Sequence, residues 1–489
     1  MQLQTTPVGD LGGALGGVPA PVLLAVIVFL IALAFRIPPR DAAGSGLRIG
    51  VGFAAIYLVL GLAADRIAPA AVRLTATTPL ALPAVDMGWP TAAAIAFGIA
   101  EIGFWMIPIF VVVNLALFAV GFTHTLDVDI HNYWHFSFIA GLVYVRTGNW
   151  PYALAVGLVL GAFSLVVADW TQPAIEETFD VDDISIPHGF SAVMAVAALP
   201  VDALVRRTPV ADLGADPETI QERLGALGEP VALGAAVGIG LGVGAYADAL
   251  GTLDGWYRIL ELGVLFAMVM YLLPEVAGIL MEGLTPLSEA VRDRMTDRFP
   301  DREFAVGLDS AILVGDQAVA AAGLLMIPIA VVMMVLLPGN ELLWGVDLAT
   351  FPFFFAMMAP IADRDVVRMV VSGTVLLVPV HYVATWLAPL VDRAGQHAGA
   401  PLGGDTIVTT GLSGSPANGV LALPMPVGLL AGLAVVAAIR VALARWPGRM
   451  YRIAGASPSQ ARTFVERRHP ERATGSPPTP ADDGGADRG

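Results

Sequence analysis

A polar and aromatic cluster interrupts a chain that is otherwise strongly hydrophobic. Residues 127–136 read Asp-Val-Asp-Ile-His-Asn-Tyr-Trp-His-Phe and follow closely on the apolar run 108–120. A carboxylate at the centre of a bilayer costs roughly 2.5–3.5 kcal/mol, so these groups must face protein, water or a ligand rather than lipid. Hydrogen-bonding groups beside flat aromatic faces suit a polyhydroxylated solute.

Further short polar islands punctuate the apolar runs. Asp169-Trp170 ends one run, and Pro187 opens the next helix, with His188 in its first turn. Leu337-Pro338-Gly339-Asn340 is a turn signal, and a half-helix after it would present free backbone N–H groups to a ligand. The other islands are Glu275 with Glu282, Gly307–Ala311, Asp347–Ala349, and Asp363 with Asp365 and Arg368.

Several of these residues have a purely structural alternative. Trp134 suits an interfacial aromatic belt as well as stacking on a solute, and His188 suits a helix cap or core position. Glu282 suits pairing with loop arginines as well as solute contact. Asp363, Asp365 and Arg368 are expected to form a solvated loop with a local ion pair. His131 and His135 have metal-ligand spacing, but without a third ligand nearby the sequence predicts no metal site and no cofactor.

Composition places the chain in the membrane. Apolar residues make up 56% of its 489 residues and charged residues only 14%. Apolar windows long enough to cross the bilayer recur along the chain, which predicts an all-α polytopic membrane protein with ten to thirteen segments. The 91–120 and 309–337 runs are too long for one simple span, so each is a tilted helix or a re-entrant hairpin. We expect breaks near Gly98 and Glu101, and near Gly315 to Gln317.

The arginines predict the orientation. All 26 basic residues are arginine, and most of them gather between the first two spans, at 205–229, at 285–303 and in the C-terminal tail. The positive-inside rule puts these segments in the cytoplasm. We therefore expect an extracellular segment at 1–19, a transmembrane domain at 20–445 with about eleven crossings, and a cytoplasmic, disordered tail at 446–489.

Charge and missing motifs exclude several functions. The formal charge of −16 argues against a nucleic-acid partner, and acidic loops without lysine resemble the adaptation of salt-loving archaea, although high genomic GC content would also replace lysine. The chain contains no cysteine, which excludes disulfides, thiolate metal sites and a phosphocysteine in this chain. It also carries no P-loop or Gly-x-Ser-x-Gly element.

The order of the islands resembles a known family. It is similar to the membrane subunit, enzyme IIC, of the galactitol class of the sugar phosphotransferase system, and more distantly to the ascorbate class. The matching elements run in family order over residues 15–445. They are Asp127–Phe136, Ala168–Trp170, Ile184–His188, Gly307–Ala311, Leu337–Asn340, Asp347–Ala349 and Leu387–Pro389. His131 and Asp316-Gln317 depart from the family pattern, which leaves the substrate open.

The resemblance implies a plasma-membrane homodimer with a fixed scaffold and a mobile core that carries a polyol or sugar. A separate soluble IIB protein, itself served by IIA, would phosphorylate the sugar. Trp134 would stack on the carbon skeleton, and His135, His188 or Glu282 would serve as general base. The full set of predicted substrate-binding residues is Asp129, Asn132, Trp134, His135, His188, Glu282, Asp309, Asn340 and Asp347, with no catalytic residue in this chain.

Two other classes of function stay open. In an H⁺- or Na⁺-coupled secondary transporter, Asp129, Asp316 and Asp347 would bind the ion and no phosphorylation would occur. A receptor or scaffold that transports nothing is the third possibility.

Overall fold

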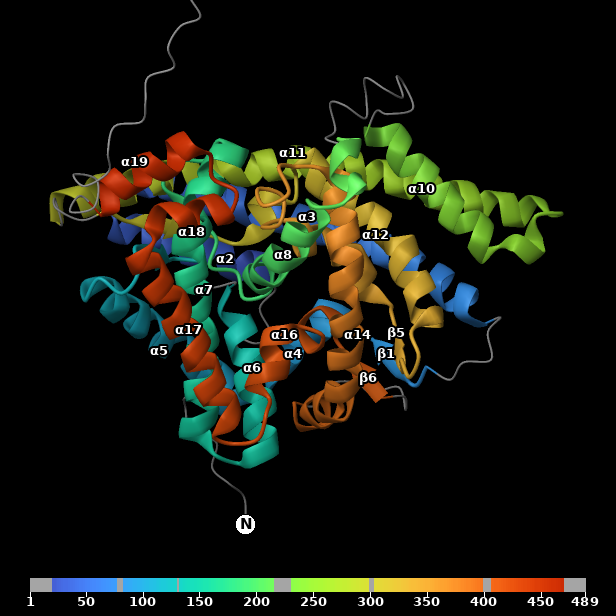
Figure 1. Cartoon of the computed structure of the whole chain (residues 1–489), viewed down its shortest axis with the longest axis horizontal. Helices are drawn as coiled ribbons and strands as arrows, with labels where there is room; N and C mark the ends of the chain where they lie inside the picture. The colour runs from blue at the N-terminus through green and yellow to red at the C-terminus, as the bar shows by residue number, and fades with distance from the viewer. Residues whose placement is uncertain are drawn as a thin grey trace, which may run out of the picture.

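Long apolar helices make up most of the molecule. The structure, a computed structural model, describes residues 20–76, 82–129, 132–214, 230–298, 303–398 and 406–469. Figure 1 shows the helices stacked into a broad bundle. Those long and apolar enough to cross a membrane are α7 (Trp150–Phe179), part of α11 (Leu253–Leu272), α12 (Gln317–Leu336), α14 (Val366–His397) and α17 (Val427–Arg445). They confirm the predicted all-α membrane class.

One group of helices packs mainly within itself. It consists of α2 (Ala20–Ala34), α3 (Pro39–Ala76), α10 (Pro230–Ala245) and α11 (Leu253–Arg298). Glycines on α10 allow its close contact with α11, because a Cβ at Gly238 would lie 2.4 Å from the Leu262 carbonyl oxygen. Small residues at such spacing let membrane helices pack backbone to backbone.

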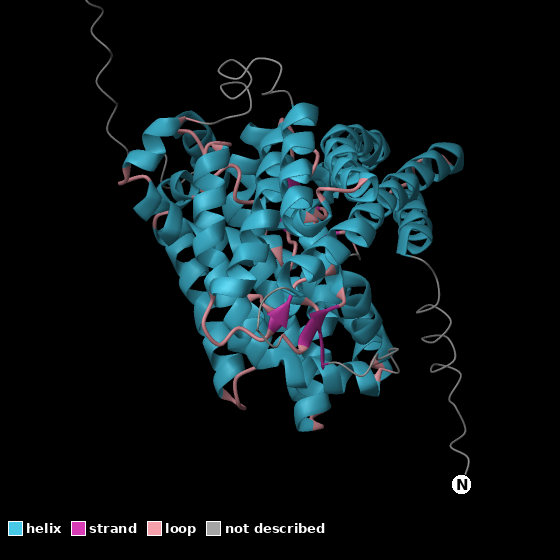
Figure 2. Cartoon of the chain, turned by 90° about the vertical axis from the view of Figure 1, so that its right-hand side faces the viewer, coloured by secondary structure: helices cyan, strands magenta, loops and turns pink. Residues whose placement is uncertain are grey.

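Two small parallel sheets, which the sequence analysis did not predict, lie within the bundle (Figure 2). Sheet A has the order β5 (Leu342–Leu343), β1 (Ala84–Asp86), β6 (Thr406–Val408). Sheet B has the order β2 (Thr125–Asp127), β4 (Ala305–Gly307), β3 (Ile184–Ser185). Strands of two or three residues are too short to show an alternating pattern in the sequence.

The strand order reveals an internal repeat. Each half of the chain contributes three strands, and its first strand is the central strand of the sheet formed by the other half. The first repeat holds α4 (Gly88–Gly98), α5 (Ala100–Ala119), α6 (Tyr133–Thr147), α7 and α8 (Ser191–Val205). The second holds α12, α13 (Phe351–Phe355), α14, α15 (Thr410–Ser413) and α16 (Pro416–Leu421).

The sequence carries the same repeat faintly, and the two copies point in opposite directions. Matching pairs are Ile107-Pro108-Ile109 with Ile327-Pro328-Ile329, Val128-Asp129 with Val346-Asp347, and Gly189-x-Ser191 with Gly411-x-Ser413. The end of α7 and the start of α14 both adjoin the C-terminal helices, since Glu177 accepts from Ser457 N and Pro360 contacts Gly455. We call this the tail end of the bundle. Such inverted repeats are typical of transporters.

Both of the overlong apolar runs break where expected. Helix α4 ends at Gly98, Ile99 leaves helical geometry at ψ 77°, and α5 starts at Ala100. In the second repeat, Asp316 caps α12 by accepting from the N–H groups of Ala318 and Val319. The two breaks occupy corresponding places before the long apolar helices α5 and α12.

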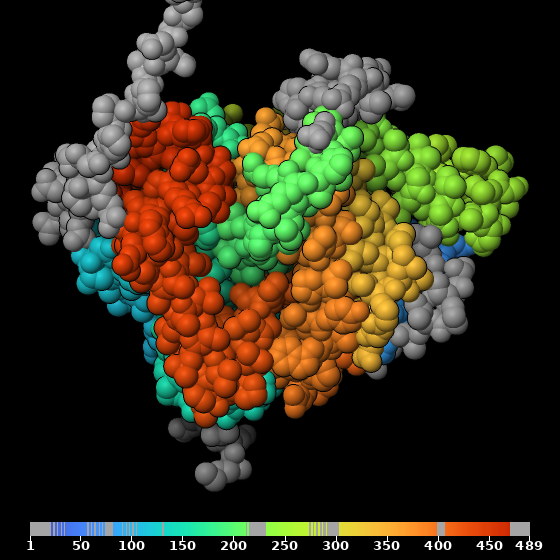
Figure 3. All heavy atoms as spheres, viewed as in Figure 1, coloured from blue at the N-terminus to red at the C-terminus, as the bar shows by residue number. Residues whose placement is uncertain are grey.

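The expected disorder of the tail differs from what the structure describes at 447–468. Helices α18 (Pro447–Ile453) and α19 (Pro458–Arg468) fold back onto the bundle and bury Tyr451 and Phe464. Composition predicted solvation, yet these aromatic side chains find an apolar partner surface that the tail alone does not contain. Figure 3 shows the red surface of these helices continuing that of α17. Residues 470–489 lie outside the described residues.

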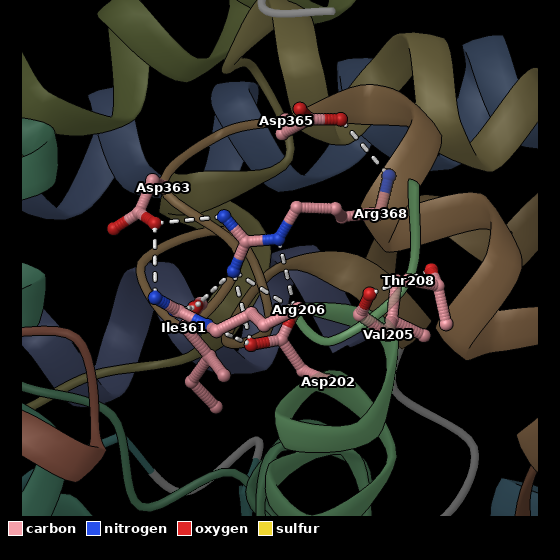
Figure 4. Close-up of polar contacts among 8 residues, drawn as sticks. All are labelled: Asp202, Val205, Arg206, Thr208, Ile361, Asp363, Asp365 and Arg368. Atoms are coloured by element: carbon pink, nitrogen blue, oxygen red, sulfur yellow. Dashed lines mark hydrogen bonds and ion pairs between the residues drawn. The ribbon is translucent and has the colours of Figure 1, made fainter. Parts of the chain in front are cut away.

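A buried ion network joins the two repeats at the tail end (Figure 4). Arg368 Nη2 donates to both carboxylate oxygens of Asp202 at 2.9 and 3.0 Å, and its Nη1 donates to Asp363 at 2.7 Å. Arg206 Nε donates to the same Asp202 at 2.7 Å. The expected solvated loop is therefore wrong for Arg368 and Asp365, which are both buried: Asp202 on α8 pairs with the Arg368 guanidinium, and Asp365 caps α14 by accepting from Arg368 N.

We expect Asp202→Ala to lower the unfolding free energy by about 3–5 kcal/mol, because it leaves the buried Arg368 guanidinium without its main partner. Chemical denaturation of the detergent-solubilised protein, followed by tryptophan fluorescence, measures this. Asp254→Ala is the control, since Asp254 and its partner Arg258 are both exposed. Equal, small effects of the two changes would contradict the role of the network.

Candidate functional site

A cavity lies between the two repeats, and its walls are mainly apolar and aromatic with a few polar groups, as in many ligand sites. It is lined from the first repeat by Trp89, Ala92, Trp134, His135, His188 and Phe190, and from the second by Asp347, Thr350, Phe353, Thr409, Gly411 and Leu412. These residues come from the segments that follow five strands of the two sheets, and Thr409 follows β6 directly. The exits of the two sheets therefore build one site.

Two histidines in the cavity hold opposite hydrogen-bonding roles. His135 Nδ1 lies 3.0 Å from the Asn132 carbonyl oxygen and must donate to it, so the neutral ring accepts at Nε2. His188 Nδ1 instead accepts from Ser191 N at 3.0 Å, so the neutral ring donates at Nε2. Their ring centroids are 4.3 Å apart, edge to face. This close approach requires Gly189, where a Cβ would lie 2.6 Å from His135 Cβ.

Flat apolar faces flank the histidines. Trp134 is tilted against His135 with ring centroids 4.1 Å apart, and Phe353 stacks on His188 at 6.0 Å. The histidine orientations are thereby fixed from both sides. The cavity offers flat walls beside a paired donor and acceptor.

Two aspartates lie behind His188. Asp309 Oδ2 is 3.9 Å from His188 Nε2, and its other oxygen accepts from Ala311 N at 2.7 Å. Asp309 N donates in turn to Asp129 Oδ2 at 3.1 Å. Asp129 therefore links the exit of β2 to the exit of β4.

Asn132 and Asp127 hold the start of α6, the helix that carries His135. Asn132 Nδ2 donates to Asp127 Oδ1 at 3.0 Å, and the Tyr133 hydroxyl donates to the Asp127 carbonyl at 2.7 Å. Both residues are buried, and among the described residues Asn132 Oδ1 and Asp127 Oδ2 have no hydrogen-bond partner. Such unsatisfied buried oxygens are expensive and are expected near a ligand site.

Asp347 and Asp86 organise the opposite wall. Asp347 accepts from Trp89 N and Gly411 N, each at 2.8 Å, and thus ties three cavity-lining segments together. Asp86, fully buried at the exit of β1, accepts from Gly88 N, Thr410 N, Gly345 N and Asp347 N at 2.8–3.1 Å. Carboxylates that accept several backbone N–H bonds are strongly anchored.

The structure brings most of the predicted site residues together. Trp134, His135, His188 and Asp347 line the cavity, whereas Asp129, Asn132 and Asp309 support its lining. Two predicted residues lie elsewhere. Asn340 closes its own turn with bonds to Met334 and Leu342, and Glu282 is exposed on α11, 3.7 Å from Arg48, which is the arginine pairing left open above.

The sequence analysis missed Asp86, Trp89 and Thr409. Asp86 stands alone in its neighbourhood, so no polar island marked it, and its role depends on segments more than 250 residues away. For Thr409 the internal repeat was the available signal, because it aligns the next two residues, Thr410-Gly411, with His188-Gly189. Among the described residues, no three His, Asp or Glu side chains are grouped as metal ligands.

An inverted-repeat bundle with a polar, aromatic-walled cavity at the repeat interface defines a membrane transport protein for a small polar solute. The family comparison is specific: residues 15–443 match the model described as the PTS system sugar-specific permease component. The chain belongs to this family of phosphotransferase-system IIC permeases, and it is a multi-pass protein of the plasma membrane.

Curated relatives agree with this assignment. The chain is similar to the "PTS system galactitol-specific EIIC component" of Escherichia coli strain K12, with 34% identity over 401 residues. The match covers 82% of this chain and 87% of the relative. The protein of the same description from Escherichia coli O157:H7 matches with the same values. The family resemblance inferred from the islands is thereby confirmed.

We expect Asp86→Asn to lower the unfolding free energy by at least about 2 kcal/mol, because an amide NH₂ cannot accept and would leave buried N–H groups unpaired. Thermal and chemical denaturation of the purified protein measure the change. Asp182→Asn, at an exposed position, is the matched control. A variant as stable as the control would show that the four N–H contacts of Asp86 are dispensable.

Proposed function

We propose that this protein carries galactitol or a closely related acyclic polyol and presents it for phosphorylation by a separate IIB protein. The single observation that carries the proposal is the His135–His188 pair, which offers one acceptor and one donor within an aromatic-walled cavity. A hydroxyl group both donates and accepts, so it matches the donor of one ring and the acceptor of the other. The names of the curated relatives supply the substrate class.

The remaining polyol hydroxyls would be bound around this pair. Asp347 lines the cavity, Asp309 supports His188 from behind, and Trp134 would pack against the carbon chain. Asn132 acts by holding the start of α6, which carries His135, and Asp129 acts by holding the Asp309 segment. His135 is our candidate for the general base at the phosphorylated hydroxyl, because its Nε2 is the acceptor of the pair.

The wider organisation follows the family. The phosphoryl group would come from a IIB protein that is itself charged by IIA. The chain would cross the membrane about eleven times with the N-terminus outside and the C-terminus in the cytoplasm. Helices α2, α3, α10 and α11, which pack mainly on one another, would form the fixed scaffold of a homodimer. The two repeats would form the mobile core.

The contacts of the aspartates favour phosphotransfer over ion coupling. Asp316, one of three proposed ion ligands, caps α12 and pairs with Arg364 at 2.8 Å. Asp347 is committed to two backbone N–H groups, and Asp129 accepts from Asp309 N. A carboxylate that anchors the backbone is poorly placed to bind and release an ion.

We expect His135→Ala to reduce galactitol affinity at least about a hundredfold, since it removes the acceptor of the pair and one wall contact, a loss of about 2.7 kcal/mol. Equilibrium binding of labelled galactitol to the purified protein measures it. His397→Ala, at an exposed end of α14, is the control. Unchanged affinity in the His135 variant would remove the histidine pair from the site.

Driving force separates the two leading mechanisms. A phosphotransfer permease draws on its phosphoryl donor, so collapse of the proton and sodium gradients should leave accumulation of phosphorylated galactitol intact. Vesicles supplied with phosphorylated IIB and labelled galactitol test this, with product analysis for phosphate. Accumulation of unmodified galactitol that stops when the gradients collapse would establish ion coupling instead.

A further inference from the structure

We propose that the C-terminal strap, residues 447–468, is a positioning element for the solute site, acting through Arg467 and Arg468 on the entry of all three strands of sheet B. The inference rests on the proposed function, because it takes the cavity as the polyol site. The family match ends at residue 443, so the strap lies outside the matched region.

The strap is docked on both repeats. Trp170 Nε1, on α7, donates to the Met450 carbonyl at 2.6 Å, and Ser457 N donates to Glu177 at 2.8 Å. On the second repeat, Gly455 at φ 108° packs so closely that a Cβ would lie 2.3 Å from the Pro360 carbonyl oxygen. This turn lies beside Ile361, whose carbonyl belongs to the ion network of Figure 4.

Arg468 ends the strap in an enclosed position. Its side chain is 1% exposed and lies over the Phe464 ring at 4.9 Å. It donates to the Asp169 carbonyl at 3.3 Å and to the Gln172 side chain. Its guanidinium is also 3.5 Å from Glu303. A buried arginine with this many partners is held in one geometry.

A residue that contacts Arg467 or Arg468 lies at the N-terminal end of each strand of sheet B. Before β2, the Asp169 carboxylate accepts from His124 N at 3.0 Å and from the Thr125 hydroxyl at 2.9 Å. Before β3, Asp183 lies 3.5 Å from Arg467. Before β4, Glu303 accepts from Arg467 Nε at 2.5 Å.

Arg467 and Arg468, and not His124, supply the positive charge at the entry of sheet B. Burial and the nearby Arg468 guanidinium lower the pKa of His124 to about 4, so His124 is neutral at physiological pH. Its Nδ1 lies 3.3 Å from the Glu303 carbonyl oxygen, which ties β2 to the β4 entry. The two arginines therefore balance the carboxylates that mark the strand entries.

The exits of the same strands carry the solute site. β2 leads to Asp129 and to the start of α6 with His135, β3 leads to His188, and β4 leads to Asp309. These strands are two or three residues long, at about 3.3 Å per residue, so the entry of each strand lies close to its exit and a shift at one is expected to move the other. The strap thus sets the positions of Asp129, His135, His188 and Asp309 relative to one another.

The test compares Arg467→Ala/Arg468→Ala with Arg449→Ala/Arg462→Ala, which removes the same charge from exposed positions of the strap. Hydrogen exchange and labelled-galactitol binding are measured on the full-length purified protein. In the first variant we expect amide exchange at 122–129, 183–188 and 303–309 to rise at least about tenfold and the galactitol Kd to rise about tenfold or more. The control should match wild type in both.

Each outcome is decisive. Faster exchange confined to 447–468, with unchanged exchange in sheet B and unchanged Kd, would make the strap a mere cover and overturn the proposal. If the double variant does not fold, Arg468→Lys replaces it, since lysine keeps the charge but loses the guanidinium fork, and the same sheet B exchange is expected to rise. Wild-type protein that binds no galactitol would sink the proposed substrate, whereas the exchange of sheet B would still test the strap.

Discussion

Satisfaction of backbone hydrogen bonds inside a membrane is the constraint on which this structure depends. Non-helical backbone is tolerated at membrane depth only where protein pairs its N–H and C=O groups. Here two three-stranded sheets provide that pairing, and each takes its central strand from the opposite repeat. Neither repeat completes its own sheet alone, so the cavity at the sheet exits forms only when the repeats are assembled.

The two halves of the cavity share a backbone plan but differ in chemistry. The recurring Val-Asp pair places Asp129 and Asp347 at equivalent points, and both accept backbone N–H groups. By the same alignment, His188 corresponds to Thr410 and His135 to Phe353. Hydrogen-bonding rings are thus concentrated on one half, and a polyol would meet donors and acceptors on one side and a mainly anchoring wall on the other.

Costly polarity in the sequence marked residues that the structure places at or behind one cavity. The 127–136 cluster, His188, Asp309 and Asp347 were found because carboxylates and imidazoles in apolar surroundings require a reason, and the structure gathers them at one cavity. Glu282 and Asn340 carried the same signal for other reasons: one pairs with Arg48 and the other closes a turn. Local polarity alone does not separate these roles.

Features that depend on distant segments escaped prediction. Asp86 accepts from N–H groups of segments hundreds of residues apart, and the buried Arg368 pairs with Asp202 on the other repeat. The prediction of a disordered tail differs from the structure at 447–468 for the same reason, since the helices that carry Tyr451 and Phe464 pack on α7. The composition of a segment shows how polar that segment is. It does not show which distant segment packs against it and buries its side chains.

These distant contacts also divide the work within the bundle. Exposed pairs such as Arg73 with Asp248 weaken with ionic strength, because charges in water are screened within about 8 Å at physiological salt. The Asp202–Arg368 network and the Arg468 site are enclosed and screened much less. The contacts that join the two repeats and meet the entries of sheet B therefore include the charges that solvent reaches least, which is the kind of support that a preorganised site requires.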